Sequence, residues 1–177
     1  MYYINNKKVK DETYIVSYNI SNKINKQICR IYELSSPEYH YEQMHHYHGC
    51  GLYISGKLIS YGTNSSRNYS RDKWIQGHSC HAEIDALRKF HKNYSNKYSS
   101  KKMFNLYSKM TLVIVRYNRD KLKNSISAPC VACSKKIKDL GIKTIIYCDE
   151  TNAYRKIKTC DYETTHISNC QKKYNLL

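Results

Sequence analysis

Two short stretches of the chain carry side chains that bind metals and transfer protons. The first is His81-Ala82-Glu83 and the second is Pro129-Cys130-Val131-Ala132-Cys133. Imidazole and thiolate groups are ligands that zinc prefers, and a site with three protein ligands keeps a fourth position open for water. Zinc lowers the pKa of such a water towards ~7, and a nearby carboxylate can accept its proton. We therefore predict a zinc site formed by His81, Cys130 and Cys133, with Glu83 as the catalytic acid and base.

The spacing within each stretch indicates how it must be presented. Cys130 and Cys133 are three residues apart, so they share one face at the first turn of a helix. His81 and Glu83 are two residues apart, and in the middle of a helix they would point to different sides. We therefore expect His81 at the start of its helix. The alternative is a closed structural zinc site, which would need ligands from elsewhere, and the chain has no second Cys-x-x-Cys.

The segments before and around the first stretch predict a hairpin, a loop and a helix. Residues 52–54 and 57–62 have strand-like composition, and the turn pair Ser55-Gly56 joins them. The polar stretch 63–76 predicts a loop. Residues 80–91 have apolar residues at helical spacing, so we expect a helix there.

The segments around the second stretch predict two parallel strands joined by a helix. The nearly continuous apolar run 111–117 is typical of a central strand, and 142–148 predicts another. The helix that begins after Pro129 supplies the crossover that a parallel pair requires. Too few residues then remain before 154–158 for a second crossover, so we expect that last strand to run antiparallel.

The N-terminal part of the chain is harder to assign. Residues 14–20 and 27–32 suit a hairpin, but Ile24, Ile28 and Ile31 equally mark one face of a helix. Further along, Ser36 and Pro37 have the types expected at a helix start, so we predict a short helix that continues to about residue 48. Polar residues 93–102 predict a mobile connection or an extra helical turn.

Length and composition set the general class. The 177 residues fit one domain, 1–177, in which 1–35 form an N-terminal extension without assigned structure and 161–177 an irregular tail. No apolar run approaches the length of a membrane span, and the N-terminus has no signal-peptide pattern, so we expect a soluble cytoplasmic protein with no membrane partner. In that compartment the six cysteines outside the zinc motif are expected to be buried or free thiols, namely Cys29, Cys50, Cys80, Cys148, Cys160 and Cys170.

The charge has two interpretations. A formal net charge of +16 indicates attraction to phosphate and hence to nucleic acid. Lys, Asn, Ile and Tyr are also the residues that AT-rich codons encode, and Tyr outnumbers Phe 19 to 2. An AT-rich genome, such as that of a parasite, a protist or a large DNA virus, would produce the same bias without a nucleic-acid partner.

Taken together, residues 45–148 resemble the cytidine and deoxycytidylate deaminase superfamily. The hairpin that ends in Gly62-Thr63-Asn64 is similar to a family hairpin ending in Gly-x-Asn. The stretches His81–Leu87 and Pro129–Cys133 are similar to its two zinc motifs, and 141–147 is similar to the segment that follows them. The resemblance implies an α/β class protein with a three-layer α/β/α fold and a mixed central sheet.

The resemblance also implies a function. We expect a zinc-dependent hydrolase acting on cyclic amidines, which replaces the amine of a cytosine-containing nucleoside or nucleotide by attack of activated water on the ring carbon. Asn64 would contact the base or sugar, Ala82 would lie against the substrate, and a homo-oligomer would fit the family. The alternative is a protein that binds nucleic acid, or edits RNA or single-stranded DNA, with little or no turnover.

Two features bear on the substrate without deciding it. His81 as first ligand is typical of relatives that act on nucleotides, RNA, DNA or free bases, whereas the hairpin resembles that of free-nucleoside enzymes. The residues before Pro129 also depart from the Thr-Leu-Glu or Ser-Glu of many relatives. We expect the choice of substrate to lie in residues 39–76 and 116–128.

Other candidate residues lie close to the predicted site. Arg67 and Trp74, with Arg71 and Lys73, suit a phosphate and a stacked base, and equally an ordinary solvated loop. Four histidines between residues 40 and 48 suit a second metal site, although we favour a solvated helix face. Of these, His48 borders the hairpin and could approach the substrate. Cys80 is expected in the core.

Overall fold

The computed structural model describes residues 20–39, 44, 46–75, 79–117 and 125–168. Within them, five strands form one mixed sheet in the order β2-β1-β3-β4-β5. β1 (Tyr47–Ile54) runs antiparallel to both β2 (Lys57–Thr63) and β3 (Met110–Tyr117). β3 pairs in parallel with β4 (Thr144–Cys148), and β5 (Tyr154–Lys158) runs antiparallel to β4.

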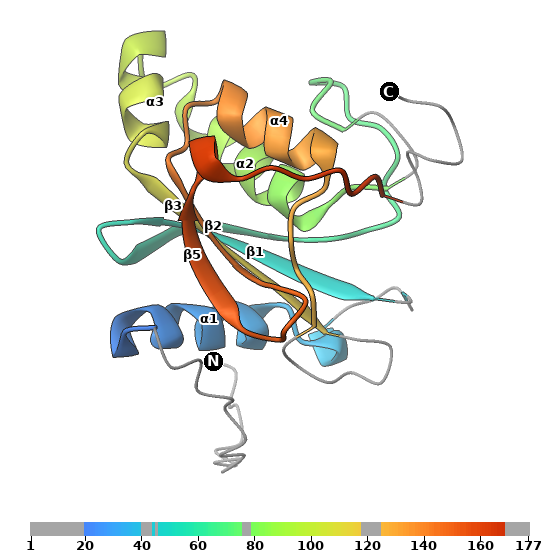
Figure 1. Ribbon diagram of the computed structural model, residues 1–177. Helices are drawn as coiled ribbons and strands as arrows, with labels where there is room; N and C mark the ends of the chain where they lie inside the picture. The colour runs from blue at the N-terminus through green and yellow to red at the C-terminus, as the bar shows by residue number, and fades with distance from the viewer. Residues whose placement is uncertain (1–19, 40–43, 45, 76–78, 118–124, 169–177) are drawn as a thin grey trace, which may run out of the picture.

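Helices cover both faces of this sheet, as Figure 1 shows. α1 (Asn22–Leu34) lies on one face, where it packs on the apolar cluster that includes Val113 and Val115. α2 (Ala82–Tyr94), α3 (Ser100–Tyr107) and α4 (Val131–Asp139) lie on the other, where the cluster includes Leu112 and Ile114. Because residues alternate between faces along a strand, β3 supplies both clusters. The predicted three-layer α/β/α fold with a mixed sheet is confirmed.

The hairpin and the crossover follow the predictions. Ser55 and Gly56 both have positive φ, at 52° and 87°, as a two-residue type I′ turn requires. The order β3-α4-β4 gives the parallel pair with its helical crossover, and Gly141, with φ of 77°, ends the helix. The last strand is antiparallel, as expected.

The predicted helix over residues 36–48 is wrong. Among the described residues of this range, Pro37–Tyr39 form a 3₁₀ turn and β1 has begun by Tyr47. Gly49 and Gly51, which directly follow the predicted helix, lie within the strand. A Cβ at Gly49 would come within 2.4 Å of Ser35 Oγ, so these glycines allow α1 to approach the sheet closely.

The helical interpretation of the N-terminal region is confirmed for residues 22–34, where Ile28 and Ile31 are buried against the sheet. Residues 14–19, the other half of the alternative hairpin, lie outside the described part of the chain. α3 was only partly anticipated, since it begins within the polar stretch 93–102 but continues to Tyr107. Ser99 caps it by accepting a hydrogen bond from the Lys102 backbone N–H.

None of the described helices is long and apolar enough to span a lipid bilayer.

Candidate active site

The two zinc-motif stretches occupy equivalent positions at the starts of two helices. His81 is the N-cap residue of α2 and Cys130 is the N-cap residue of α4, and both have extended backbone angles. Neither side chain makes a capping hydrogen bond to its own helix, and both turn towards the space between the helix ends. The expectation that His81 lies at a helix start is met.

The three predicted ligands converge. His81 Nδ1 lies 3.5 Å from Cys130 Sγ and 3.3 Å from Cys133 Sγ, and the three donor atoms all lie within 4.8 Å of one another. A tetrahedral zinc ion with Zn–N of about 2.0 Å and Zn–S of about 2.3 Å would separate nitrogen from sulfur by about 3.5 Å. The donor set and its spacing therefore fit a zinc ion with one position left open.

The local electrostatics favour a thiolate. The hydrogen bond with Cys133, together with the neighbouring His81, lowers the pKa of Cys130 to about 4. The same hydrogen bond, followed by burial, raises the pKa of Cys133 well above its usual value. A divalent cation would stabilise both sulfurs as thiolates.

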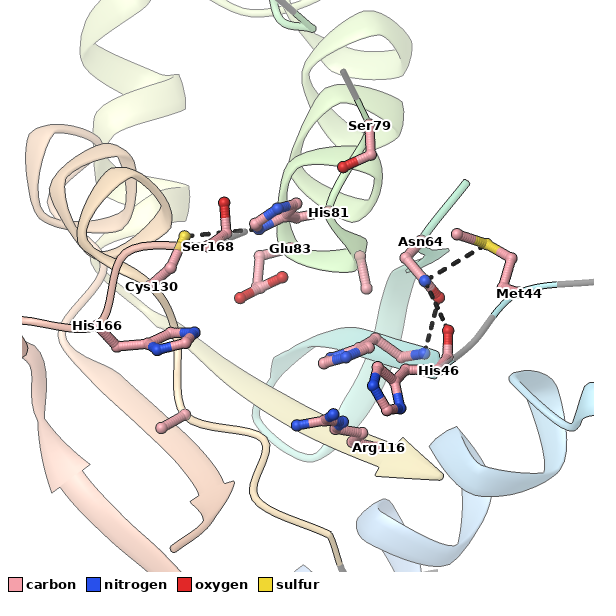
Figure 2. Close-up of a pocket in the computed structure, with 13 residues that line it drawn as sticks. Met44, His46, Asn64, Ser79, His81, Glu83, Arg116, Cys130, His166 and Ser168 are labelled. Carbon is pink, nitrogen blue, oxygen red and sulfur yellow. Dashed lines mark hydrogen bonds between the residues drawn. The ribbon is translucent and has the colours of Figure 1, made fainter. Parts of the chain in front are cut away.

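Glu83 lies beside this group. Its side chain is 5% exposed and lines the pocket in front of the ligands, and Figure 2 shows its carboxylate between His81 and Arg116. Burial raises the pKa of Glu83, while His81 lowers it in part. A buried carboxylate with a raised pKa next to a metal site is typical of a group that takes up and returns protons.

The approach to Cys130 is held by contacts from distant parts of the chain. Ser127 Oγ donates a hydrogen bond to the Ile114 carbonyl and accepts one from the Cys148 backbone N–H, both at 2.8 Å, so it bridges β3 and β4. On the other side, Tyr162 Oη donates to the Pro129 carbonyl at 2.6 Å. These contacts fix the start of α4 and with it the two cysteines.

The pocket has a volume of about 320 Å³ and is lined by residues from several distant parts of the chain. α2 and α4 supply the zinc-motif residues, the ends of β1 and β3 supply His48 and Arg116, and the segment after β5 supplies His166 and Ser168. Its volume is at the lower end of the range of about 300–1,000 Å³ for small-molecule sites. The pocket therefore suits a small metabolite or one extruded base.

His48 and Arg116 are direct cross-strand partners in the β1–β3 ladder. Alternation along the strands places them on the same face as Cys50 and Ile114, which is the α2/α4 face. Burial, and then the charge of Arg116, lowers the pKa of His48 to about 3, so its ring is neutral. His48, predicted only as a possible neighbour of the substrate, thus lines the pocket.

Asn64 lines the pocket too, but its amide group is engaged by the chain itself. Its Oδ1 accepts from the His48 backbone N–H at 2.7 Å, and its Nδ2 donates to the His46 carbonyl at 2.9 Å and to Met44 Sδ. Asn64 therefore ties the end of β2 to the segment that leads into β1. Ala82, fully buried as the first residue of α2, also lines the pocket.

The histidine cluster is not the solvated helix face that we favoured. His46 and His48 both line the pocket, because this segment pairs as a strand instead of forming a helix. His40 and His45 lie outside the described residues.

The remaining candidates lie elsewhere. Trp74 packs against the His91 ring, at 5.0 Å between centroids, and Lys136 Nζ lies 4.4 Å from its ring. Neither Trp74 nor the exposed Arg67 is among the described residues that line the pocket. Cys80 is buried, as expected of a core residue, and its backbone bridges to Ser65.

Sequence reasoning missed several lining residues. Arg116 falls at the start of the range 116–128 that we expected to decide the substrate, but it was not singled out as a site residue. His166 and Ser168 belong to a stretch without periodicity, and nothing local marks them. The Val131 backbone N–H donates to the His166 carbonyl at 2.9 Å, which draws this stretch across the start of α4.

Comparison with known proteins places the chain in a family. The sequence profile of the cytidine and deoxycytidylate deaminase zinc-binding region matches residues 22–149. The fold is similar to that of cytidine deaminase from Burkholderia pseudomallei, with a TM-score of 0.51 and 16% identity over 84% of this chain and 100% of that one. It is also similar to dCMP deaminase from the cyanophage S-TIM5, with a TM-score of 0.44 and 19% identity over 71% and 82% of the two chains. No curated protein matches the chain.

The profile covers most of the chain, including both zinc-motif stretches and the strands that position them. The structural likeness independently supports the same fold. The chain therefore belongs to the cytidine and deoxycytidylate deaminase zinc-binding family.

Proposed function

We propose that the protein is a zinc-dependent hydrolytic deaminase of a cytosine-containing nucleoside or nucleotide. The observation that carries this proposal is the position of Glu83. It is a buried carboxylate in a small pocket, directly in front of three donors arranged for zinc. A purely structural zinc site has no need of a carboxylate that does not bind the metal.

His81, Cys130 and Cys133 would hold the ion. Zinc bound there would supply Lewis acidity, which lowers the pKa of a water towards ~7. The role of the chain is to present that water and the substrate to Glu83. Its buried carboxylate can take a proton from water and hold it. It can then deliver protons to the ring nitrogen and to the departing amine, so that ammonia leaves.

Substrate placement is shared among the surrounding walls. Ala82 lies between the first ligand and Glu83, where its small side chain leaves room for a flat base. Asn64 contributes mainly by positioning His46 and His48, because its amide group forms hydrogen bonds with the backbone of both residues. The polar side chains of those two histidines then face the part of the substrate farthest from the metal ligands.

The test compares wild-type protein with Glu83→Gln. Both proteins are loaded with zinc, metal content is measured, and ammonia release is assayed over cytidine, deoxycytidine, their monophosphates, cytosine and single-stranded oligonucleotides. Loss of the acid and base is expected to lower turnover by about 10²- to 10⁴-fold while zinc is retained. Glu33→Gln, an exposed change on α1, is the matched control.

Two results would contradict the proposal. One is wild-type protein that binds zinc and releases ammonia from none of these compounds. The other is turnover that Glu83→Gln leaves unchanged, which would remove Glu83 from the mechanism.

The net charge of +16 supports a second function, in which the fold binds nucleic acid with little turnover. Such binding would come from phosphate contacts, so its affinity must fall steeply as salt concentration rises. Affinity for a single-stranded oligonucleotide that does not change between 50 and 200 mM salt would exclude this alternative.

A further inference from the structure

Arg116 enters the pocket with most of its hydrogen-bonding capacity unused. Its Nη1 donates to the Ile126 carbonyl at 3.2 Å, but a guanidinium carries five N–H donors. Its Nε is buried and has no hydrogen-bond partner in the described part of the chain. A buried donor without an acceptor is unfavourable, because it has lost its hydrogen bonds to water. Within the described residues, the guanidinium therefore has donors left for an acceptor on a bound ligand.

No carboxylate balances this charge within the described residues. Arg116 takes part in none of the ion pairs found there, and the pocket lining contains one acid, Glu83. Elsewhere in the same structure, Arg88 and Arg155 each have an aspartate partner. Among the described residues, the pocket thus holds a cation that has no carboxylate partner.

Three histidines line the same pocket as this cation. His48 is its direct cross-strand partner, and His46 and His166 line the same pocket. A neutral imidazole offers one N–H donor, and a protonated imidazole offers two. A planar guanidinium flanked by imidazole donors is the kind of group that recognises the oxygens of a phosphate.

The position of this group matches the far end of a nucleotide. Figure 2 shows Arg116 and His46 across the pocket from His81 and Cys130, with Glu83 between them. A base whose amine carbon faces Glu83 would direct its sugar, and any phosphate on it, away from the metal ligands. The cationic wall is the part of the pocket that such a phosphate would reach.

We propose that Arg116, together with His48 and His166, binds the phosphate of the substrate, so that the protein acts on nucleoside monophosphates in preference to nucleosides. This rests on the proposed function for the reaction, but the binding itself does not depend on turnover. His166 lies outside the region that matches the family profile, so this chain adds part of the subsite from its own C-terminal segment.

The test is equilibrium binding by calorimetry to zinc-loaded Glu83→Gln protein, in which ligand is not consumed. The ligands are cytidine, deoxycytidine, adenosine and guanosine, each paired with its monophosphate, and inorganic phosphate serves as the probe of the subsite alone. At least one monophosphate is expected to bind about 10- to 100-fold more tightly than its nucleoside, the range expected for charge-assisted hydrogen bonds. Inorganic phosphate should compete with that monophosphate.

Variants assign the preference to named side chains. Arg116→Gln should remove most of the difference between monophosphate and nucleoside while leaving nucleoside affinity nearly unchanged. His166→Asn should reduce it in part, and because the His166 side chain is exposed and only its backbone holds α4, this change should not affect folding. Arg30→Gln, the same charge change on α1 behind the sheet, is the matched control.

Three outcomes would overturn the inference. The first is that no monophosphate binds more tightly than its nucleoside. The second is that Arg116→Gln weakens both ligands by the same factor, which would mean that Arg116 only anchors the loop at Ile126. The third applies if Arg116→Gln does not fold. It is that His166→Asn binds monophosphate over nucleoside with the same preference as the protein without this change. By contrast, Arg116-dependent binding of a monophosphate by wild-type protein that releases no ammonia would contradict the proposed function and leave this inference standing.

Discussion

Gly62 controls how closely α2 approaches the sheet, and Gly62→Ala should therefore disturb both stability and the zinc site. A Cβ on Gly62 would lie 2.3 Å from the backbone nitrogen of Ala86 and 2.6 Å from the carbonyl oxygen of Ala82. Both atoms belong to the α2 backbone and cannot rotate away. Because ordinary contact begins at 3.4 Å, α2 must move outward by about 1 Å.

The magnitude follows from this displacement. Overpacking of this kind costs about 1–3 kcal/mol. Since each kcal/mol lowers Tm by about 2–4 °C in a chain of this size, we expect Gly62→Ala to melt about 2–12 °C below wild type. α2 also carries His81 at its N-cap, and functional groups must be held to about 0.5 Å. A shift of about 1 Å should weaken zinc binding and lower any turnover about 100-fold.

The assay measures thermal unfolding by circular dichroism and zinc content after dialysis against a defined free-zinc buffer. Gly51→Ala is the comparison, because its Cβ would meet the side chain of Ile31 on the opposite face of the sheet. It should lower Tm but leave zinc content at the wild-type level. The reasoning fails if Gly62→Ala melts within about 1 °C of wild type, or if Gly51→Ala loses as much zinc as Gly62→Ala.

Three further perturbations have directions that the structure determines. Ser127→Ala removes the hydroxyl that bridges β3 and β4 and leaves two buried backbone groups unpaired. Urea unfolding should therefore show that the free energy of unfolding falls by about 1–3 kcal/mol. The exposed Ser100→Ala should lower it by less than about 0.5 kcal/mol. Burial tends to raise the pKa of Asp149, but hydrogen bonds from Thr151, Arg155 and Ala153 lower it to about 2. The stability advantage of wild type over Asp149→Asn should therefore be complete at pH 7 and disappear as the pH falls from 3.8 towards 2. An advantage that persists at pH 2 would argue against these contacts. Removal of zinc by a chelator should lower the Tm of wild type. The loss of stability should be about 2.7 kcal/mol if the free zinc concentration was 100 times the Kd. An equal fall in the Tm of Cys133→Ser would show that the chelator acts elsewhere.

The metal end of the site could be predicted because its determinants are local. A helix-start signal and a three-residue spacing place Cys130 and Cys133 on one turn, and these rules operate within a few residues. His81 had to lie at a helix start for Glu83 to face the same space, and it does. Only the proximity of the two helix starts depends on the overall fold. The crossover from β3 through α4 to β4 brings the start of α4 close to the start of α2.

Local signals failed where strand pairing on both sides overrode them. Ser36 and Pro37 have the types of a helix start, yet the segment that follows joins β1, which pairs along its full length with β3 and also with β2. The gain from two ladders exceeds any local helix preference. A glycine just after a predicted helix is typical of a helix end. In the structure, Gly49 instead lies within β1, where the absence of a side chain allows α1 to pack closely on the sheet.

The register of the β1–β3 ladder decides which side chains line the pocket opposite the zinc-motif residues. His48 and Arg116 face the pocket because the β1–β3 ladder pairs them, and a slip of one residue would send both to the α1 face. No spacing along the chain links two residues on different strands, so their partnership was not visible in the sequence. The same holds for His166, which reaches the pocket only because its carbonyl accepts from the first N–H of α4. The zinc motif is therefore a feature of the family, while the pairing of distant strands and the C-terminal segment determine which other residues line the pocket of this chain.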